Sequence, residues 1–94
     1  MRKVIYRITY PNGKIYVGKD LTDSATYFGS VNSDIVAADF SQAELDDFTI
    51  RKEVIWSSDT ATDSEVNQVE VKLIHENDSN NPKVGYNRWP KYKP

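Results

Sequence analysis

The order of apolar and polar residues predicts two strands near the start of the chain. Residues 4–10 are rich in β-branched and aromatic side chains, and residues 14–18 resume the same strand pattern. The Pro-Asn-Gly run at 11–13 is typical of a tight turn, because Asn and Gly tolerate a positive φ. These segments together predict a β-hairpin. Tyr6 and Tyr16 stand on its two arms, where we expect them to be cross-strand neighbours. An ordinary aromatic pair on a sheet face is the favoured alternative to a functional role for them.

The middle of the chain predicts shorter helices and strands. Residues 19–31 are polar and predict a connection. Residues 33–39 place Ile, Val and Ala behind an Asn/Ser start, which favours a short helix, and the Ser-Gln-Ala-Glu run at 41–44 matches a capping box that opens another turn of helix. Residues 48–56 are strand-type residues and predict a third strand.

The clearest helical pattern follows a second capping box, at residues 62–65. Val66, Val69 and Leu73 fall on one face of that helix. Residues 78–82 are helix breakers, and after them we expect a loop or an extended tail. The predicted order β-β-α-α-β-α indicates a small α/β domain of the α+β type, with a mostly antiparallel three-stranded sheet packed by helices.

Composition narrows the class of protein. The 94 residues predict one domain, 1–94, with 88–94 as a C-terminal tail. The chain has no cysteine and one histidine, which excludes a disulfide scaffold, a cysteine nucleophile and a structural zinc site. The N-terminal apolar run is broken by Arg7 and is too short for a signal peptide or a membrane span. We therefore expect a cytoplasmic protein with no membrane partner.

The charges are segregated along the chain. The net charge is -2, yet residues 1–19 sum to +5, residues 20–70 to -10 and residues 71–94 to +3. Chain ends often lie close together in compact domains, so the two basic ends are expected to form one face that meets phosphate. Chance unevenness in a small domain is the equal alternative.

Rings and cations alternate near the C-terminus. Such a run can stack bases and contact phosphates. The equal or better alternative is a tail that covers the edge of a small core, with Trp89 packed down. The residues of this run are Tyr86, Arg88, Trp89, Lys91, Tyr92 and Lys93.

Glu70 interrupts the apolar stripe of the last helix. It is four residues from both Val66 and Ile74, so it lies on or beside the stripe. A buried carboxylate is costly unless it is paired, hydrogen-bonded or bound to a metal, which makes Glu70 a candidate site residue. On pattern alone, the favoured alternative is a Glu70 at the edge of the stripe that reaches water and pairs with Lys72 or Arg51.

Four short motifs, taken in order, resemble those of the GIY-YIG nuclease family. The triplets Val-Ile-Tyr at 4–6 and Tyr-Val-Gly at 16–18 resemble the paired motifs that name the family. Glu70 in a late helix is similar to the family's metal-binding glutamate, and Gly-Tyr-Asn at 85–87 resembles its closing motif. The resemblance covers residues 4–87 and implies the family's fold.

The resemblance also implies a divalent-metal-dependent DNA endonuclease that hydrolyses phosphodiester bonds with one Mg²⁺ or Mn²⁺ ion, held by Glu70. Tyr6 would act as general base or position the water, and Lys14 would lower its pKa from the ordinary value of about 10. Tyr16 would assist by hydrogen bonding, and Asn87 would brace the site. A homodimer or a partner protein would add affinity for DNA.

One departure bears on catalysis. The family usually has an arginine on its first helix, eight residues after the glycine that corresponds to Gly18, and Thr26 stands there. Arg51 or Lys19 would supply the missing cation from another direction. For Arg51, a surface ion pair with an Asp or Glu is the equal alternative. Otherwise the chain is a catalytically inactive module that binds nucleic acid or protein on the same scaffold. The first glycine of the family name is also replaced, by Val4.

Overall fold

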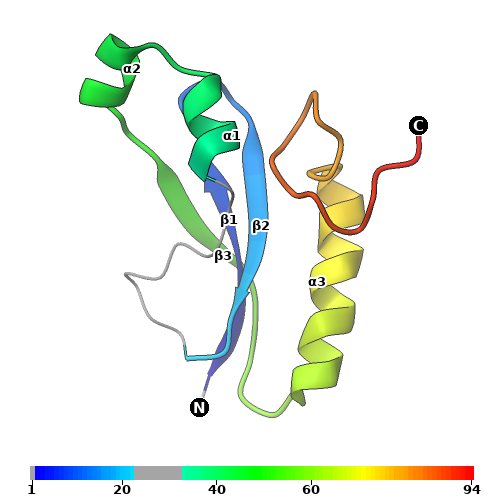
Figure 1. Cartoon of the computed structure of the whole chain (residues 1–94). Coiled ribbons are helices and arrows are strands. Elements are labelled where there is room, and N and C mark those ends of the chain that lie inside the picture. The colour runs from blue at the N-terminus through cyan, green and yellow to red at the C-terminus, as the bar shows by residue number, and fades with distance from the viewer. Residues whose placement is uncertain (1, 23–32) are drawn as a thin grey trace.

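The computed structural model describes residues 2–22 and 33–94. It contains the predicted order of elements, which confirms an α+β fold with a three-stranded antiparallel sheet (Figure 1). The greater part of the connection predicted over 19–31 lies outside the described residues. The elements are β1 (Lys3–Thr9), β2 (Ile15–Asp20), α1 (Ser33–Ala38), α2 (Gln42–Asp46), β3 (Arg51–Ser58) and α3 (Asp63–Asn77).

The predicted hairpin joins β1 to β2, and β1 is the central strand in the order β2-β1-β3. The turn closes where the Tyr10 N–H donates to the Lys14 carbonyl at 2.9 Å. Gly13 has a φ of 84°, a conformation that glycine adopts without a steric penalty. The turn is therefore made by the residues that the sequence pattern indicated.

The register of the hairpin corrects the expected position of the two tyrosines. Tyr6 lies opposite Gly18, and Tyr16 lies opposite Ile8. Tyr6 and Tyr16 therefore share one face of the sheet as diagonal neighbours and are not directly opposed. The pairing of Tyr10 with Lys14 sets this register, because each step away from the turn moves both partners by one residue.

Alternation along the strands divides the core between the two faces of the sheet. Ile5 and Val17 face α3, which runs along one side of the sheet (Figure 1). Ile8 and Tyr10 point to the other face, which α1 covers. The buried residues on the α3 side are Ile5, Val17, Val66 and Ile74, and those on the α1 side are Ile8, Tyr10, Val36, Phe40 and Tyr86.

The third strand begins later than predicted, at Arg51 and not at residue 48. Phe48 instead packs in an aromatic group, with its ring centroid 5.0 Å from that of Phe40 and 6.1 Å from that of Tyr10. Aromatic side chains are common both in strands and in loops that pack on a core. The strand preference of Phe48 therefore did not determine where β3 begins.

The last helix is capped as the sequence predicts. The Glu65 N–H donates to the Thr62 hydroxyl, and the Thr62 N–H donates to the Glu65 carboxylate, which completes the capping box. The helix ends at Asp78, whose φ of 54° is left-handed. Of the predicted stripe, Val66 is buried and Val69 and Leu73 are partly buried, and Ile74 is buried beside them. No helix in the described part of the chain is long and apolar enough to cross a membrane.

The two basic ends of the chain do not form one face. The start of β1 and the C-terminal segment lie at opposite ends of the sheet (Figure 1). Near the start, Lys3 pairs with Asp63 at 2.8 Å and Arg7 pairs with Glu53 at 2.8 Å. The hydrogen bond from Arg7 holds the pKa of the Glu53 carboxyl below its usual range. The expected common basic face is therefore wrong.

Substitution Gly18→Ala should lower the free energy of unfolding by about 1–3 kcal/mol, the usual cost of overpacking a filled site. A Cβ at this position would stand 2.6 Å from Cζ of the Tyr6 ring, which crosses over the glycine. Urea unfolding measures the change. In a Tyr6→Val background the same substitution should cost less, because the ring is gone. An equal cost in both backgrounds would contradict this packing.

Candidate functional site

The outer side of β2 needs partners for its backbone. The strand lies at the edge of the sheet, so every second residue turns its N–H and C=O away from β1. These residues are Ile15, Val17 and Lys19. Buried backbone groups without hydrogen bonds are costly, so other parts of the chain must reach this edge.

The segment after α3 pairs with the first of these residues. The Ile15 N–H donates to the Val84 carbonyl at 3.1 Å, and the Tyr86 N–H donates to the Ile15 carbonyl at 2.9 Å. Gly85 lies between them so closely that a Cβ would stand 2.5 Å from the Ile15 oxygen. Only glycine fits this approach, which explains the glycine of the 85–87 triplet.

Asn87 binds the second of these residues with its side chain. The Val17 N–H donates to Asn87 Oδ1, and Asn87 Nδ2 donates to the Val17 carbonyl, both at 2.8 Å. Both bonds are buried. The Asn87 side-chain amide thus makes the two hydrogen bonds that the backbone of a neighbouring strand would make to Val17. This contact fixes the path of the C-terminal segment along β2.

Glu70 reaches the third of these residues from α3. Its carboxylate accepts the Lys19 N–H, and burial raises the pKa of the Glu70 carboxyl although the Lys19 charge and this hydrogen bond oppose the rise. Glu70 does not form the ion pair with Lys72 or Arg51 that was the alternative from the sequence. Lys72 pairs with Glu76 at 3.8 Å, and Arg51 lies 3.6 Å from Glu53.

Tyr6 reaches the same part of β2 from the α1 face of the sheet. Its phenol ring lies over Gly18, and its side chain is buried, with the residue 1% exposed. The Lys52 ammonium stands 4.8 Å from the centre of the Tyr6 ring. Tyr6 therefore approaches Gly18 over a face of the sheet. Glu70 approaches the next residue, Lys19, at the edge of the sheet.

Three predicted site residues lie elsewhere. Lys14 is at the hairpin end of β2, where it pairs with Asp39 at 3.1 Å. Arg51 is on β3, at the opposite edge of the sheet, with a side chain 73% exposed. Tyr16 packs against the cluster around Ile8. The position of the missing family arginine, Thr26, lies outside the described residues.

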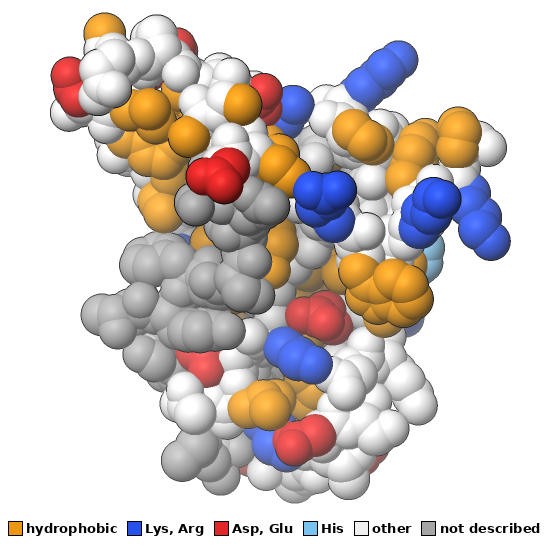
Figure 2. Space-filling view, viewed as in Figure 1, with side chains coloured by type: hydrophobic (Ala, Val, Ile, Leu, Met, Phe, Trp, Pro, Cys, Tyr) orange, Lys and Arg blue, Asp and Glu red, His pale blue; other side chains and the backbone are white. Residues whose placement is uncertain are grey.

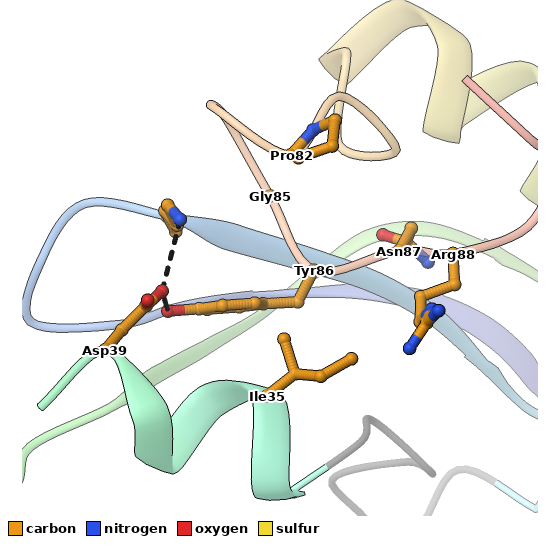
Figure 3. Close-up of a pocket in the computed structure, with 8 residues that line it drawn as sticks. Ile35, Asp39, Pro82, Gly85, Tyr86, Asn87 and Arg88 are labelled. Atoms are coloured by element: carbon orange, nitrogen blue, oxygen red, sulfur yellow. Dashed lines mark hydrogen bonds and ion pairs between the residues drawn. The ribbon is translucent and has the colours of Figure 1, made fainter.

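A pocket of about 340 Å³ adjoins Asn87, between α1 and the C-terminal segment (Figure 3). Its floor is Tyr86, whose hydroxyl donates to Asp39 at 2.7 Å. Burial and this carboxylate raise the pKa of Tyr86 to about 12, and the same bond, with that from Lys14, lowers the pKa of Asp39. The Lys14, Asp39 and Tyr86 group is thus mutually satisfied. Arg88 extends from the rim on the α1 side (Figure 3).

Lys52 was not predicted as a site residue. Lys52 lies opposite Ile8 in the sheet, so its nearness to Tyr6 depends on the pairing of β1 with β3. The residues around Lys52 in the sequence do not indicate that β1 pairs with β3. Arg88 was predicted only as a member of the C-terminal run of rings and cations, and not as a catalytic residue.

The donor set at the site is small. Among residues 2–22 and 33–94 no three His, Asp or Glu side chains gather where they could hold a metal ion, so Glu70 stands as a single carboxylate. No family model, no curated protein and no solved structure matches the chain.

Substitution Asn87→Ala should lower the free energy of unfolding by about 1–3 kcal/mol, because it leaves the buried Val17 N–H and C=O without partners. Hydrogen exchange at the Val17 amide should accelerate with it. Gln68→Ala, which removes an exposed amide from α3, is the matched control and should change neither quantity. Unchanged exchange at Val17 in the Asn87 variant would contradict the edge contact.

Substitution Glu70→Gln should stabilise the protein at neutral pH. The folded pKa of Glu70 lies above the unfolded value, so folding favours the protonated carboxyl. Its contribution is complete below the unfolded pKa of about 4.3 and is lost as pH rises through the folded pKa. Glutamine keeps the acceptor for Lys19 without the charge. Urea midpoints should agree near pH 4 and separate toward pH 7, with the variant higher.

The exposed Glu76→Gln on the same helix is the control for that series, and it should show no such pH-dependent gain. A Glu70→Gln protein less stable than wild type at pH 7 would contradict the raised pKa.

Proposed function

We propose that the protein is a divalent-metal-dependent DNA endonuclease of the GIY-YIG type, which hydrolyses phosphodiester bonds at the outer edge of β2. The observation that carries the proposal is the approach of Glu70 and Tyr6 to successive residues of that strand, Lys19 and Gly18. The four sequence motifs support it, because three of them supply side chains that contact β2: Tyr6, Glu70 and Asn87.

Glu70 fits the role of a metal ligand by its environment. It is half-buried, and its raised pKa means that the protein compensates its charge only in part. A hard cation would complete that compensation, and Mg²⁺ needs only one or two carboxylates when waters and phosphate oxygens fill its remaining positions. When bound, Mg²⁺ or Mn²⁺ supplies Lewis-acid polarisation of the phosphate.

The remaining roles belong to residues of β1, β2 and β3. Tyr6 orients the attacking water and accepts its proton, and the Lys52 charge beside the ring favours the phenolate that this step requires. Lys19, next to Glu70, supplies the cation that the family places on its first helix. The Lys19 ammonium is held toward α3 by a hydrogen bond to Asn67.

A catalytically inactive module that binds nucleic acid or protein is the second candidate. The burial of Tyr6 favours it, because a general base needs access to water. Thr26 in place of the family arginine favours it too. Both candidates use the same surface, and they differ in whether the phosphodiester bond breaks.

Cleavage of supercoiled plasmid tests the two candidates. Wild type should convert it to nicked circles with Mg²⁺ or Mn²⁺ and not with EDTA. Glu70→Gln should lose about two orders of magnitude in rate or more, which is typical when one group that stabilises transition-state charge is removed. Glu76→Gln, on the same helix, should nick at the wild-type rate.

Circular dichroism establishes that each variant is folded. Nicking that survives in Glu70→Gln or in EDTA would overturn the proposed mechanism. A folded wild type that cuts neither plasmid, forked DNA nor single-stranded DNA would establish the inactive module instead.

A further inference from the structure

Trp89 stands out on the surface. It is 73% exposed, although the sequence favoured a packed position for it. Among the described residues only one other large hydrophobic side chain is exposed, Val54 at 44%, and it lies on β3 at the other edge of the sheet. Trp89 is therefore a single exposed ring and not part of an apolar patch of the size that docks another protein.

The backbone on both sides of Trp89 is anchored. Two residues before it, the Asn87 side chain is bonded to Val17 at 2.8 Å. One residue after it, the Pro90 carbonyl accepts from Asn80 Nδ2 at 2.7 Å. The ring is thus exposed on a chain segment that is held in place, which reduces the ordering cost of binding.

The surroundings of the ring are cationic. From residue 79 to the C-terminus the chain has four basic residues and no acidic one. None of the four forms an ion pair within the part of the chain that the structure describes. Figure 2 shows Lys and Arg side chains over the C-terminal segment, with hydrophobic side chains among them. The four are Lys83, Arg88, Lys91 and Lys93.

A lone exposed indole between cations suits one ligand chemistry. An aromatic ring stacks on a nucleobase, and the neighbouring cations contact the flanking phosphates. Bases inside a duplex are already stacked on each other, so the ring stacks on a base that is unpaired.

We infer that Trp89, with Arg88 and Lys91 beside it, is a stacking site for an unpaired base of single-stranded DNA or of a single-strand extension from a duplex. This inference rests on the proposed function in taking DNA as the substrate, and it adds the kind of DNA. The site adjoins the β2 edge through Asn87, which binds Val17, the residue before Gly18.

Binding in EDTA tests this site without any cleavage. Fluorescence anisotropy would measure the dissociation constants for a labelled thymidine oligonucleotide of about 12 residues, a forked duplex and a blunt duplex. Trp89→Ala should weaken binding to the oligonucleotide and the fork by about 5- to 150-fold, the range for loss of one stacked base. Blunt-duplex binding should change less than about twofold.

Three variants sharpen the test. Trp89→Phe should retain most of the affinity, because a ring remains. Val54→Ala, which shortens the other exposed apolar side chain, should bind as wild type. Arg88→Gln should weaken binding to all three DNAs and reduce the salt slope by about one, since it removes a phosphate contact.

Tryptophan emission gives a direct readout of stacking. Wild type should be quenched by the oligonucleotide and Trp89→Phe should not, because Trp56 is partly buried against the α3 core. Unchanged single-strand affinity in Trp89→Ala, or an equal loss on blunt duplex, would overturn the stacking site. Neither result depends on nicking, so failure of the endonuclease proposal is seen separately.

Discussion

The unpaired outer side of β2 is the constraint on which the site depends. Three residues of this strand turn backbone groups away from the sheet, and three different structures satisfy them. The chain after α3 pairs with Ile15, the Asn87 amide pairs with Val17, and the Glu70 carboxylate accepts from Lys19. In a short chain with a small core, this edge holds α3, β2 and the C-terminal segment in one arrangement.

The same contacts raise a question about Glu70. As an acceptor for one backbone N–H, glutamine would serve as well and would carry no charge into a half-buried position. The raised pKa shows that the fold disfavours the carboxylate, even with Lys19 beside it. A purely structural role therefore accounts for an acceptor at this position but not for a negative charge. The divalent cation that we propose as a ligand of Glu70 would account for both.

Local signals predicted much of the fold but little of the site's geometry. The turn at 11–13 and the capping box at Thr62 depend on interactions within a few residues. The hairpin and α3 could therefore be predicted from the sequence. Glu70 was visible as a break in the stripe, yet its partner Lys19 is 51 positions away and depends on how α3 lies on β2. The alternation of rings and cations near Trp89 is compatible with a packed or an exposed ring. The exposure of Trp89 could therefore not be predicted from the sequence.

The pairing of charges determines which side of the molecule an anion such as a phosphate can approach. Carboxylates of the acidic middle segment neutralise the cations of the sheet: Lys3 pairs with Asp63, Arg7 with Glu53 and Lys14 with Asp39. The cations between residue 79 and the C-terminus have no such partner in the described part of the chain. A net charge of -2 then repels phosphate from most of the surface while this segment attracts it. Because Asn87 ties the segment to Val17 and Glu70 lies beside Lys19, these cations and Glu70 belong to segments that meet the same edge of β2, the edge at which we propose that DNA is cleaved.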